Sequence, residues 1–379
     1  MKKMRVLHVS TAHRPNDPRI AYRVLPTLAP HYEIIAMLPN AMADCSNSIR
    51  YVRLPHFRRV WVRLLLSHPL VLWHALRLRP TLLHLYDPEL LPVARLIQRL
   101  LSIPVVYEVH ENLHKKMAVK QVQQGWYLAR PFRYFDQLAR RHFHLIFTEH
   151  AYLDTYTGLA KPHVVVYNYP ALPFLEPFRF TYQPSRQHPE FFYVGGLSFD
   201  RALDVLVAGF ARLAERHPAF TVHLFGPRHF TQAQFEALPG YARVRHNLRF
   251  YGYTDQRDAL PYAGRATAGL ALLKPVGDYP ESYPTKLFEY MALGLPVVTS
   301  DFPLYRDVVE RHRCGFCVPP DDPVRLAEVL TYLIEHPGEA QAMGERGQRA
   351  VERDYTWESE AQKLLRFYER VLRLDKVTD

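Results

Sequence analysis

The chain has 379 residues, of which 48% are hydrophobic and 22% charged; this balance excludes a largely disordered protein and favours two domains. Its formal net charge is +11, and the excess lies entirely in the first half: residues 1–180 hold 24 Lys and Arg against 11 Asp and Glu, a net of +13, whereas residues 181–379 hold 24 against 26, a net of −2. A basic N-terminal half suggests a nucleic acid, an anionic membrane surface or a phosphorylated substrate as its partner.

The cysteines and the apolar runs bear on the compartment. Cys45, Cys314 and Cys317 are too few for a disulfide framework, so we expect a reducing cytosol. Cys314 and Cys317 form a lone CxxC, which lacks the second pair of a structural zinc site, and we expect both thiols to pack in the interior. The start MKKMRVLHVS has too short an apolar stretch for a signal peptide, and no 18-residue apolar span predicts a membrane helix.

Short β-branched runs alternate with helical patterns through the first half of the chain. RVLHVS, YEIIAML, TLLHLY and PVVYEV predict strands, and the segments between them predict helices, which is the βαβ rhythm of a doubly wound parallel sheet. Asp87 precedes Pro88 at the expected carboxyl edge of this sheet, where ligands bind. We interpret Asp87 and Glu89 as helix-capping residues, with acceptor binding as the alternative.

The rhythm breaks at a proline-rich connector and starts again at FFYVGG. We therefore expect an α/β protein of two Rossmann-like domains that face a central cleft. The expected parts are an N-terminal domain of residues 1–175, a linker of residues 176–190, a C-terminal domain of residues 191–356 and a helix of residues 357–379 that crosses back onto the first domain.

The most informative stretch is YPESYPTKLFEYMALGLPVVTS, residues 279–300. Pro284 stands where a first helical residue would, and Gly294 fits a C-terminal stop, which predicts a helix over about 284–293 with Glu281 in the loop before it. At about 1.5 Å rise per residue, Glu289 lies roughly 7.5 Å into this helix. The two carboxylates flank the helix N-terminus, where N–H groups and the positive end of the dipole favour a phosphate.

Two glutamates separated by seven residues and followed by EYMALGLPVV resemble the retaining glycosyltransferase family four, which has the GT-B fold; the resemblance covers nearly the whole chain. It implies that Glu281 contacts the transferred sugar, that Glu289 contacts the ribose, and that main-chain N–H groups from Thr285 to Leu287 meet the diphosphate. It also implies a nucleotide-diphosphate sugar, with UDP or GDP favoured, as donor for the C-terminal domain, an acceptor site in the N-terminal domain, and no required cofactor or metal.

The stretch YVGGLSFDRALDVL begins the second domain with a predicted strand, a glycine pair and a helix. Gly195 and Gly196 permit close approach of the backbone to a phosphate. The family commonly carries an Arg and then a Lys in this loop, but here Gly196 stands at the usual Arg and Arg201 alone fills the later basic position. We expect Lys286 or Lys274 to supply the missing positive charge.

His110 ends the predicted strand PVVYEV, where the family has a His that faces the donor sugar. With Glu281 it is the expected catalytic residue, and a structural role is the alternative. The run HENLH also matches the HExxH zinc motif. Zinc binding needs both histidines on one face of a helix, whereas His110 directly follows a strand, so we expect no metal site.

The first strand-to-helix loop, STAHRPND, lacks the glycines that many relatives carry near the acceptor. Asn16, Asp17 and Arg19 are the candidates for acceptor binding. The alternative, held at equal weight, is that Asp17 is only an N-cap ahead of Pro18.

Residues 56–80 interleave aromatic and basic side chains and contain no acid. The residues concerned are Arg58, Arg59, Arg63, Arg77, Arg79, Trp61 and Trp73. Residues 114–144 add Lys115, Lys116, Lys120, Arg130, Arg133, Arg140 and Arg141 against only Asp136. Such helices predict peripheral contact with an anionic membrane, on its cytoplasmic face, and core helices with a solvated basic side are the alternative. Nucleic acid is disfavoured because no known binding module is visible.

The sequence thus predicts a retaining enzyme of the hexosyltransferase type that uses a nucleotide sugar and a lipid-linked or surface-polysaccharide acceptor. A nucleotide-sugar epimerase or a phosphorylase of related fold is the alternative among enzymes, although no lysine context for pyridoxal phosphate is visible. A non-catalytic scaffold that binds a membrane or a partner is the alternative from a different class.

Overall fold

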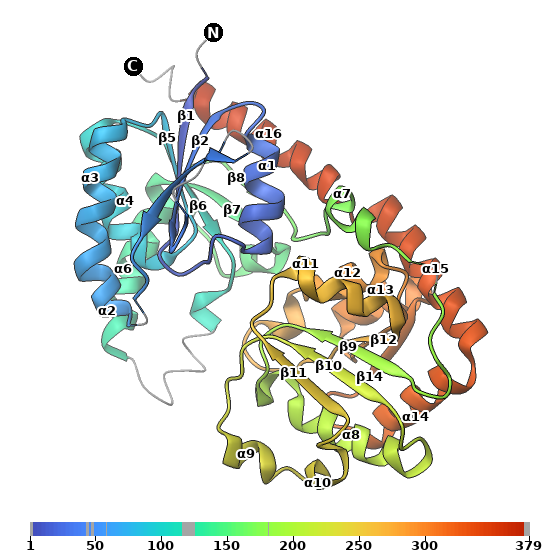
Figure 1. Cartoon of the computed structure of the whole chain (residues 1–379). Helices are drawn as coiled ribbons and strands as arrows, with labels where there is room; N and C mark the ends of the chain where they lie inside the picture. Colours follow the sequence, from blue (N-terminus) through green and yellow to red (C-terminus); the bar gives the residue numbers. More distant parts are fainter. Residues whose placement is uncertain are drawn as a thin grey trace. The chain divides into compact units, whose positions relative to one another are not determined.

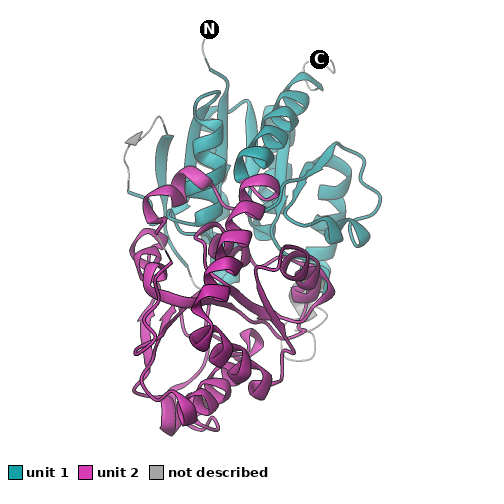
Figure 2. Cartoon of the chain, turned by 90° about the vertical axis from the view of Figure 1, so that its right-hand side faces the viewer, with its two compact units in different colours: residues 1–168, 357–379 teal, residues 169–356 magenta. Residues whose placement is uncertain are grey.

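The computed structural model describes residues 3–42, 45–46, 49–57, 59–115, 126–180 and 182–374 (Figure 1). The chain divides into two compact units, coloured separately in Figure 2: unit 1 comprises residues 1–168 and 357–379, and unit 2 comprises residues 169–356. Each unit contains one sheet of parallel strands connected by helices. The predicted α/β class with two Rossmann-like domains is confirmed.

The sheet of unit 1 has the strand order β3-β4-β2-β1-β5-β6-β7-β8. Its strands are β1 (Arg5–Val9), β2 (Glu33–Pro39), β3 (Cys45–Ser46), β4 (Ile49–Leu54), β5 (Leu82–Leu85), β6 (Val105–Val109), β7 (His144–Phe147) and β8 (His163–Val165). All pair in parallel except β3, which is antiparallel to β4. The order reverses between β1 and β5, and at such a switch point the loops after the two strands part and leave room for a ligand.

Helices cover the faces of this sheet. They are η1 (Ile20–Val24), α1 (Leu25–Leu28), α2 (Val60–Val62), η2 (Arg63–Ser67), α3 (His68–Leu78), η3 (Pro88–Leu90), α4 (Leu91–Leu101), α6 (Trp126–His142), η4 (His150–Asp154) and α16 (Trp357–Leu374). The last helix, α16, is fixed within unit 1 by polar contacts: Nε1 of Trp357 donates to Oγ1 of Thr27 (2.9 Å), and Glu360 accepts the N–H of Tyr167 (2.9 Å).

The sheet of unit 2 is wholly parallel, with the order β11-β10-β9-β12-β13-β14 and its switch point between β9 and β12. Its strands are β9 (Glu190–Val194), β10 (Thr221–Phe225), β11 (Leu248–Gly252), β12 (Ala266–Ala271), β13 (Val297–Ser300) and β14 (Gly315–Val318). Its helices are α7 (Leu172–Leu175), η5 (Glu176–Phe178), η6 (Phe199–Arg201), α8 (Leu203–Arg216), α9 (Gln232–Glu236), α10 (Tyr241–Val244), α11 (Gln256–Ala259), η7 (Leu260–Arg265), η8 (Tyr279–Glu281), α12 (Thr285–Ala292), α13 (Pro303–His312), α14 (Pro323–Glu335) and α15 (Pro337–Asp354). Residues 176–190, expected as a linker, contain η5 and lie within unit 2.

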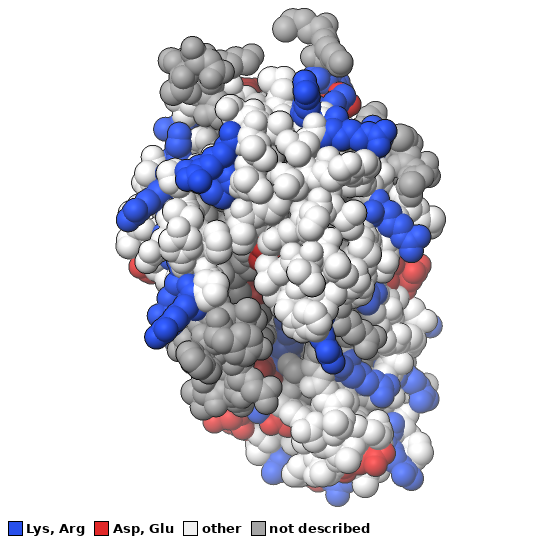
Figure 3. Space-filling model, turned by 90° about the vertical axis from the view of Figure 1, so that its left-hand side faces the viewer, with Lys and Arg blue, Asp and Glu red and all other residues white. Residues whose placement is uncertain are grey.

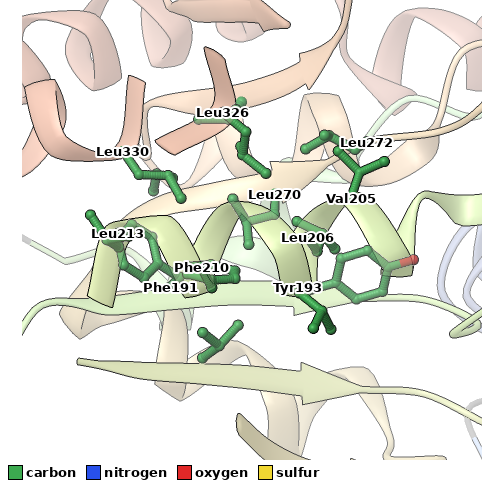
Figure 4. Close-up of a cluster of buried hydrophobic side chains, with 14 of the residues drawn as sticks. Phe191, Tyr193, Val205, Leu206, Phe210, Leu213, Leu270, Leu272, Leu326 and Leu330 are labelled. Carbon is green, nitrogen blue, oxygen red and sulfur yellow. The ribbon is translucent and has the colours of Figure 1, made fainter. Parts of the chain in front are cut away.

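The core of unit 2 is built around α8, which is packed between the sheet and α14 (Figure 4). The rings of Phe191 on β9 and Phe210 on α8 pack at a tilt with centroids 5.1 Å apart, and both are buried. A Cβ on Gly209 would lie 2.6 Å from Cδ2 of Leu326, so the absence of a side chain there lets α8 and α14 approach closely. None of the helices formed by the described residues is both long and apolar enough to cross a bilayer.

Candidate donor site and polar centre

Two loops of unit 2 meet closely where β9 and β10 end. Gly195 has φ +141° and donates its N–H to the carbonyl of Phe225 (2.8 Å), while Gly226 has φ +144°. A Cβ on Gly226 would lie 1.9 Å from the carbonyl oxygen of Gly195. Only glycine fits this approach at Gly226, and the backbone conformation at Gly195 also favours glycine. The loop after β9 is thereby held in a tight turn at the carboxyl edge of the sheet.

Two cations lie over this turn. A Cβ built on Gly195 would lie 3.4 Å from Nζ of Lys286 and 3.6 Å from Nη1 of Arg201. A Cβ on Gly196 would lie 3.7 Å from Nε of the same arginine. The structure therefore brings together four of the predicted donor-binding residues, and Lys286 stands where it can replace the basic side chain that is missing at Gly196.

The amine of Lys286 is buried without a hydrogen-bonding partner among the described residues. The residue is 6% exposed, and its Nζ rests 3.5 Å from the ring centroid of Tyr193. Burial lowers the pKa of Lys286 well below its ordinary value, the positive charge of Arg201 lowers it further, and Glu289 opposes this in part. A buried ammonium group next to a second cation is unfavourable unless an anion completes the site, and a diphosphate has the required acceptor oxygens.

Lys274, the other predicted source of positive charge, is engaged elsewhere. Its Nζ lies 2.6 Å from Oδ2 of Asp204 on α8, and its N–H donates to the carbonyl of Asp200. Because its charge is already paired with a carboxylate, Lys274 supports the fold around η6 and α8 in this structure. Of the two lysines, Lys286 is the one at the glycine turn.

The predicted helix of the Glu281–Glu289 motif is present as α12. It ends at Ala292, Leu293 is its C-cap, and after it Gly294 has φ +75° while the N–H of Leu295 donates to the carbonyl of Tyr290 (2.9 Å). This Schellman arrangement is the expected glycine stop. Pro284, however, is the extended N-cap residue (φ −72°, ψ 119°) and not the first helical residue.

The main chain at Leu287 corrects one expectation. Its N–H donates to the carbonyl of Pro284 (2.9 Å), and its side chain is fully buried. The N–H of Leu287 is therefore used inside the first turn of α12. Thr285 and Lys286, one and two residues after the N-cap, remain the positions at which main-chain contact with a phosphate is predicted.

The two glutamates of the motif differ in their surroundings. Glu289 is 6% exposed on α12, whereas Glu281 is exposed at the end of the short helix η8, not in an irregular loop. The segment that carries Glu281 is anchored by buried Tyr305, whose one hydroxyl proton is shared between the carbonyl oxygens of Tyr279 (2.6 Å) and Ser282 (3.0 Å). No spacing in the sequence pointed to Tyr305, because it lies on a separate helix, α13.

In unit 1, His110 follows β6 and joins a network of buried polar groups. Its Nε2 lies 2.9 Å from Oε1 of Glu108, which also accepts from Nε of Arg19 (2.7 Å). Glu108 is fully buried; burial acts to raise its pKa, but the charges of Arg19 and His110 hold that pKa well below its ordinary value. The His110 ring also packs against His13 and Tyr86, with centroids 5.0 and 5.7 Å away.

The three acceptor candidates of the first loop have different surroundings. Arg19 is 2% exposed and donates to Glu108 and to the carbonyl of Tyr167 (3.0 Å), so its guanidinium serves the interior of unit 1. Asp17 accepts from the N–H groups of Arg19 (3.0 Å) and Ile20 (3.2 Å), as the capping alternative predicted. Asn16 is half-buried. Acceptor binding by Asn16 or Asp17 stays a prediction.

His13 is a site residue that the sequence analysis missed. Its Nδ1 lies 3.0 Å from Oδ2 of Asp17, and its Nε2 lies 3.5 Å from Oδ1 of Asp87. Burial acts to lower the pKa of His13, but the hydrogen bond and charge of Asp17 and the charges of Asp87 and Glu108 raise it to about 9. His13 is thus a cation held between carboxylates.

The expectation that Asp87 and Glu89 cap a helix was wrong. Oδ2 of Asp87 accepts from Oγ of Ser10 (2.8 Å) and from the N–H of Thr11 (2.5 Å), and no capping hydrogen bond to its own helix forms. Glu89 accepts from Nε of Arg63 (2.6 Å) and Oγ1 of Thr11 (3.0 Å). Because β1 and β5 are neighbours in the sheet, the loop after β1 lies beside Asp87 and Glu89 and supplies hydrogen-bond donors to both carboxylates.

The described residues contain no group of three or more His, Cys, Asp or Glu side chains arranged to hold a metal ion. His114, the second histidine of HENLH, pairs with Asp136 (2.9 Å). Cys314 is buried, and burial raises the pKa of both Cys314 and Cys317 to about 12, as expected for packed thiols that are not reactive.

Comparison with known proteins places most of unit 2 in a family. Residues 176–350 match the model described as "Glycosyl transferases group 1". The chain is 25% identical over 189 residues to glycogen synthase of Mycobacterium tuberculosis, covering 49% of this chain and 44% of that protein. It is 34% identical over 128 residues to phosphatidyl-myo-inositol mannosyltransferase of Mycobacterium leprae, covering 34% and 33%. The chain thus spans less than half the length of these curated relatives.

Solved structures extend the likeness of fold to the whole chain. Sucrose-phosphate synthase from Thermosynechococcus elongatus superposes with a TM-score of 0.80 at 17% identity, covering 98% of this chain and 100% of that one. Anabaena HepE in complex with UDP and glucose superposes with a TM-score of 0.71 at 16% identity, covering 97% and 99%. The chain has the two-domain GT-B fold, and its residues 176–350 belong to the group 1 glycosyltransferase family.

Proposed function

We propose that this chain transfers a sugar from a nucleotide-diphosphate donor to a saccharide acceptor. The observation that carries the proposal is the pair of cations over the Gly195 turn, of which Lys286 is buried with no hydrogen-bonding partner among the described residues. A diphosphate would satisfy both Lys286 and Arg201. It would also lie near the N-terminus of α12, whose dipole favours an anion.

The two glutamates give the donor a proposed orientation. Glu289 lies three residues beyond Lys286 on α12 and is suited to accept hydrogen bonds from the ribose hydroxyls. Glu281 stands exposed before the helix and is assigned to the hydroxyls of the transferred sugar. Structures of HepE with UDP and with UDP-glucose share this fold, so uridine nucleotides are the first donors to test, followed by guanosine nucleotides.

In the proposed reaction the bond between the anomeric carbon and the diphosphate oxygen breaks. The acceptor hydroxyl oxygen forms the new glycosidic bond, and its proton passes to the departing diphosphate oxygen. Negative charge grows on the departing diphosphate, where Lys286 and Arg201 offset it without reorganisation. Retention of configuration and a hexose as the transferred group are proposed from the resemblance of the Glu281–Glu289 motif to the retaining family.

Unit 1 is proposed to bind the acceptor, a lipid-linked or surface polysaccharide. His110 is 17% exposed at the end of β6, and it is proposed to contact the donor sugar. Asn16 and Asp17 lie on the loop after β1, at the switch point of the sheet, and are proposed to contact the acceptor. Arg19 is given a positioning role, because it holds Glu108 against His110.

The test is calorimetric titration of UDP, GDP and their sugar conjugates into the wild type, Glu281→Ala and Glu289→Ala. Loss of one charge-assisted hydrogen bond, about 1.5–3 kcal/mol, predicts that Glu289→Ala binds the free nucleotide roughly 10- to 100-fold more weakly. Glu281→Ala should bind the free nucleotide normally and the nucleotide sugar more weakly. Unchanged affinity for every nucleotide sugar in both variants would remove the donor-site assignment.

Product analysis separates the transferase from its alternatives. A transferase releases free nucleotide in proportion to acceptor, and the anomeric coupling constant of the product reports retention or inversion. An epimerase converts the donor sugar without acceptor and without net nucleotide release. A non-catalytic scaffold does neither.

A further inference from the structure

One side of unit 1 carries exposed apolar residues among arginines. It is formed by α2, η2, α3, α4 and α6, with α3 packed on α4 and α4 on α6, and we call their exposed residues the basic apolar face. Figure 3 views the molecule from the side on which these helices lie in Figure 1. The side chains of Leu65, Trp61 and Trp73 are 66%, 57% and 51% exposed. Exposed large apolar side chains grouped in this way mark a binding surface.

The helices of this face carry more apolar side chains than the core of unit 1 buries. In α3, Val71 and Ala75 point inward and are buried, whereas Leu70, Trp73 and Leu76 form a second apolar stripe that is exposed. On α4, Leu96 and Leu100 are likewise exposed. A helix that is apolar on both sides requires apolar surroundings on both sides. This disfavours the alternative of core helices with a simply solvated basic side.

The charges on the same face have one sign. Residues 45–86 contain no Asp or Glu, and α4 contains none. The single acid of α6, Asp136, is fully buried and pairs with Arg140 and His114. Exposed arginines stand on α3, α4 and α6 and immediately before α2, namely Arg77, Arg99, Arg130, Arg133, Arg141 and Arg59. Burial lowers the pKa of His142, and the positive charges of Arg95, Arg99, Arg141 and Lys161 lower it further, which reports a positive local potential.

We propose that the basic apolar face docks on an anionic lipid bilayer, with its arginines at the headgroups and its leucines and tryptophans at the boundary with the acyl chains. Charge complementarity selects this occupant, because the same face of a second copy would oppose arginine to arginine. A nucleic acid would leave the exposed leucines in water. An anionic membrane surface meets both needs. This inference rests on the proposed function in one respect: the membrane is the surface at which the proposed transferase would meet a lipid-linked acceptor.

The test is co-sedimentation of the full chain with vesicles at 50 and 500 mM NaCl. Neutral vesicles contain phosphatidylcholine alone, and anionic vesicles contain 30% phosphatidylglycerol. We expect binding to anionic vesicles at low salt, at least 10-fold weaker binding at high salt, and weak binding to neutral vesicles. Each arginine near an anionic surface is worth about 5-fold in partitioning, equivalent to about 1 kcal/mol, so Arg77→Gln/Arg99→Gln/Arg133→Gln should reduce partitioning about 100-fold.

Two further variants localise the contact. The pair Leu65→Ser/Leu66→Ser removes apolar surface that is exposed in the free protein, and it should weaken the binding that survives at high salt. The control Arg212→Gln/Arg249→Gln/Arg349→Gln removes the same charge from exposed positions of unit 2 and should change binding far less. Equal losses in the two arginine triples would overturn the assignment to this face. If Leu65→Ser/Leu66→Ser binds vesicles at high salt as tightly as the wild type does, the proposed insertion of the leucines into the bilayer is overturned.

The remaining outcomes also decide. No binding to anionic vesicles at 50 mM NaCl overturns the proposal. A concentration-dependent dimer that the leucine pair abolishes, without vesicle binding, makes a second copy the occupant. Tight binding of a random oligonucleotide without vesicle binding makes it a nucleic-acid surface. Vesicle binding needs no donor, so a chain that binds vesicles but no nucleotide keeps this inference and removes the proposed transferase.

Discussion

Replacement of Lys286 by methionine should raise the thermal stability of the free protein and at the same time lower its affinity for the donor. Met keeps the length and apolar stem of the side chain, so its packing against Tyr193 is preserved while the unpaired amine is removed. An unsatisfied buried donor destabilises a protein by about 1–3 kcal/mol, and more when it is charged. Unit 2 has 188 residues (169–356), a size at which 1 kcal/mol shifts the melting temperature by about 2–4 °C.

The same substitution removes one of the two cations over the Gly195 turn. A hydrogen bond to a charged group contributes about 1.5–3 kcal/mol, so the affinity for UDP should fall roughly 10- to 100-fold. The pKa of Lys286 is lowered by burial and by Arg201, and a bound diphosphate would raise it again. Binding to the wild type should therefore take up a proton and weaken as pH rises above the lowered pKa, whereas binding to Lys286→Met should lack this dependence.

The assays are differential scanning calorimetry of the free chain and titration calorimetry with UDP from pH 6 to 10. The control is Lys161→Met, which removes the same charge from an exposed position of unit 1 and should change neither quantity. A lower melting temperature for free Lys286→Met would refute the claim that the buried amine, which has no hydrogen-bonding partner among the described residues, destabilises the free protein. UDP affinity within twofold of the wild type would refute its contact with the diphosphate.

Two other predictions concern stability. Gly226→Ala should lower the melting temperature in calorimetry by about 5 °C or more, because φ is +144° and the new Cβ would lie 1.9 Å from the carbonyl oxygen of Gly195. The control is Gly277→Ala, where φ is also positive but no atom lies within 4 Å of the new Cβ. If Gly226→Ala lowers the melting temperature no more than this control does, the steric explanation is wrong. The pKa of His13 is raised to about 9, so the stabilisation by its positive charge is complete below about pH 6.5 and is lost as pH rises through 9. In denaturant unfolding, His13→Gln should therefore lower the free energy of unfolding by on the order of 1–3 kcal/mol at pH 6, and by nothing above pH 9. A loss of stability that grows with pH would contradict this sign.

The features that the sequence predicted well are those that local chemistry decides. The helix from Thr285 to Ala292 stops before Gly294, and this could be predicted because the positive φ of Gly294 and the hydrogen bonds of the last turn involve only neighbouring residues. The parallel sheets were predictable for the same reason, since the alternation of strand and helix patterns is readable in short windows. The grouping of Gly195 with Arg201 also follows from proximity along the chain.

The features that could not be predicted depend on packing between distant segments. Asp87 was expected to cap its own helix, but it accepts a hydrogen bond from Ser10, which lies 77 residues earlier in the loop after β1. The two segments meet because β1 and β5 are neighbours in the sheet. Arg19 was one of three candidates for acceptor binding, and in the structure it pairs with buried Glu108 of β6. Composition and spacing give no information on either pairing.

The choice between Lys274 and Lys286 shows what such packing adds to a functional argument. In the sequence both are lysines near the donor motif, and either could replace the missing arginine. In the structure Lys274 meets Asp204, so its charge is already balanced, whereas the charge of Lys286 is set against Arg201 and is opposed only in part by Glu289. At the switch point of unit 1, His13 is held between Asp17 and Asp87, while Nη2 of Arg19 and Nε2 of His8 are buried without a hydrogen-bonding partner among the described residues. The proposed position of the diphosphate beside Lys286 therefore rests on the glycine turn and on the second cation, Arg201, next to the buried amine.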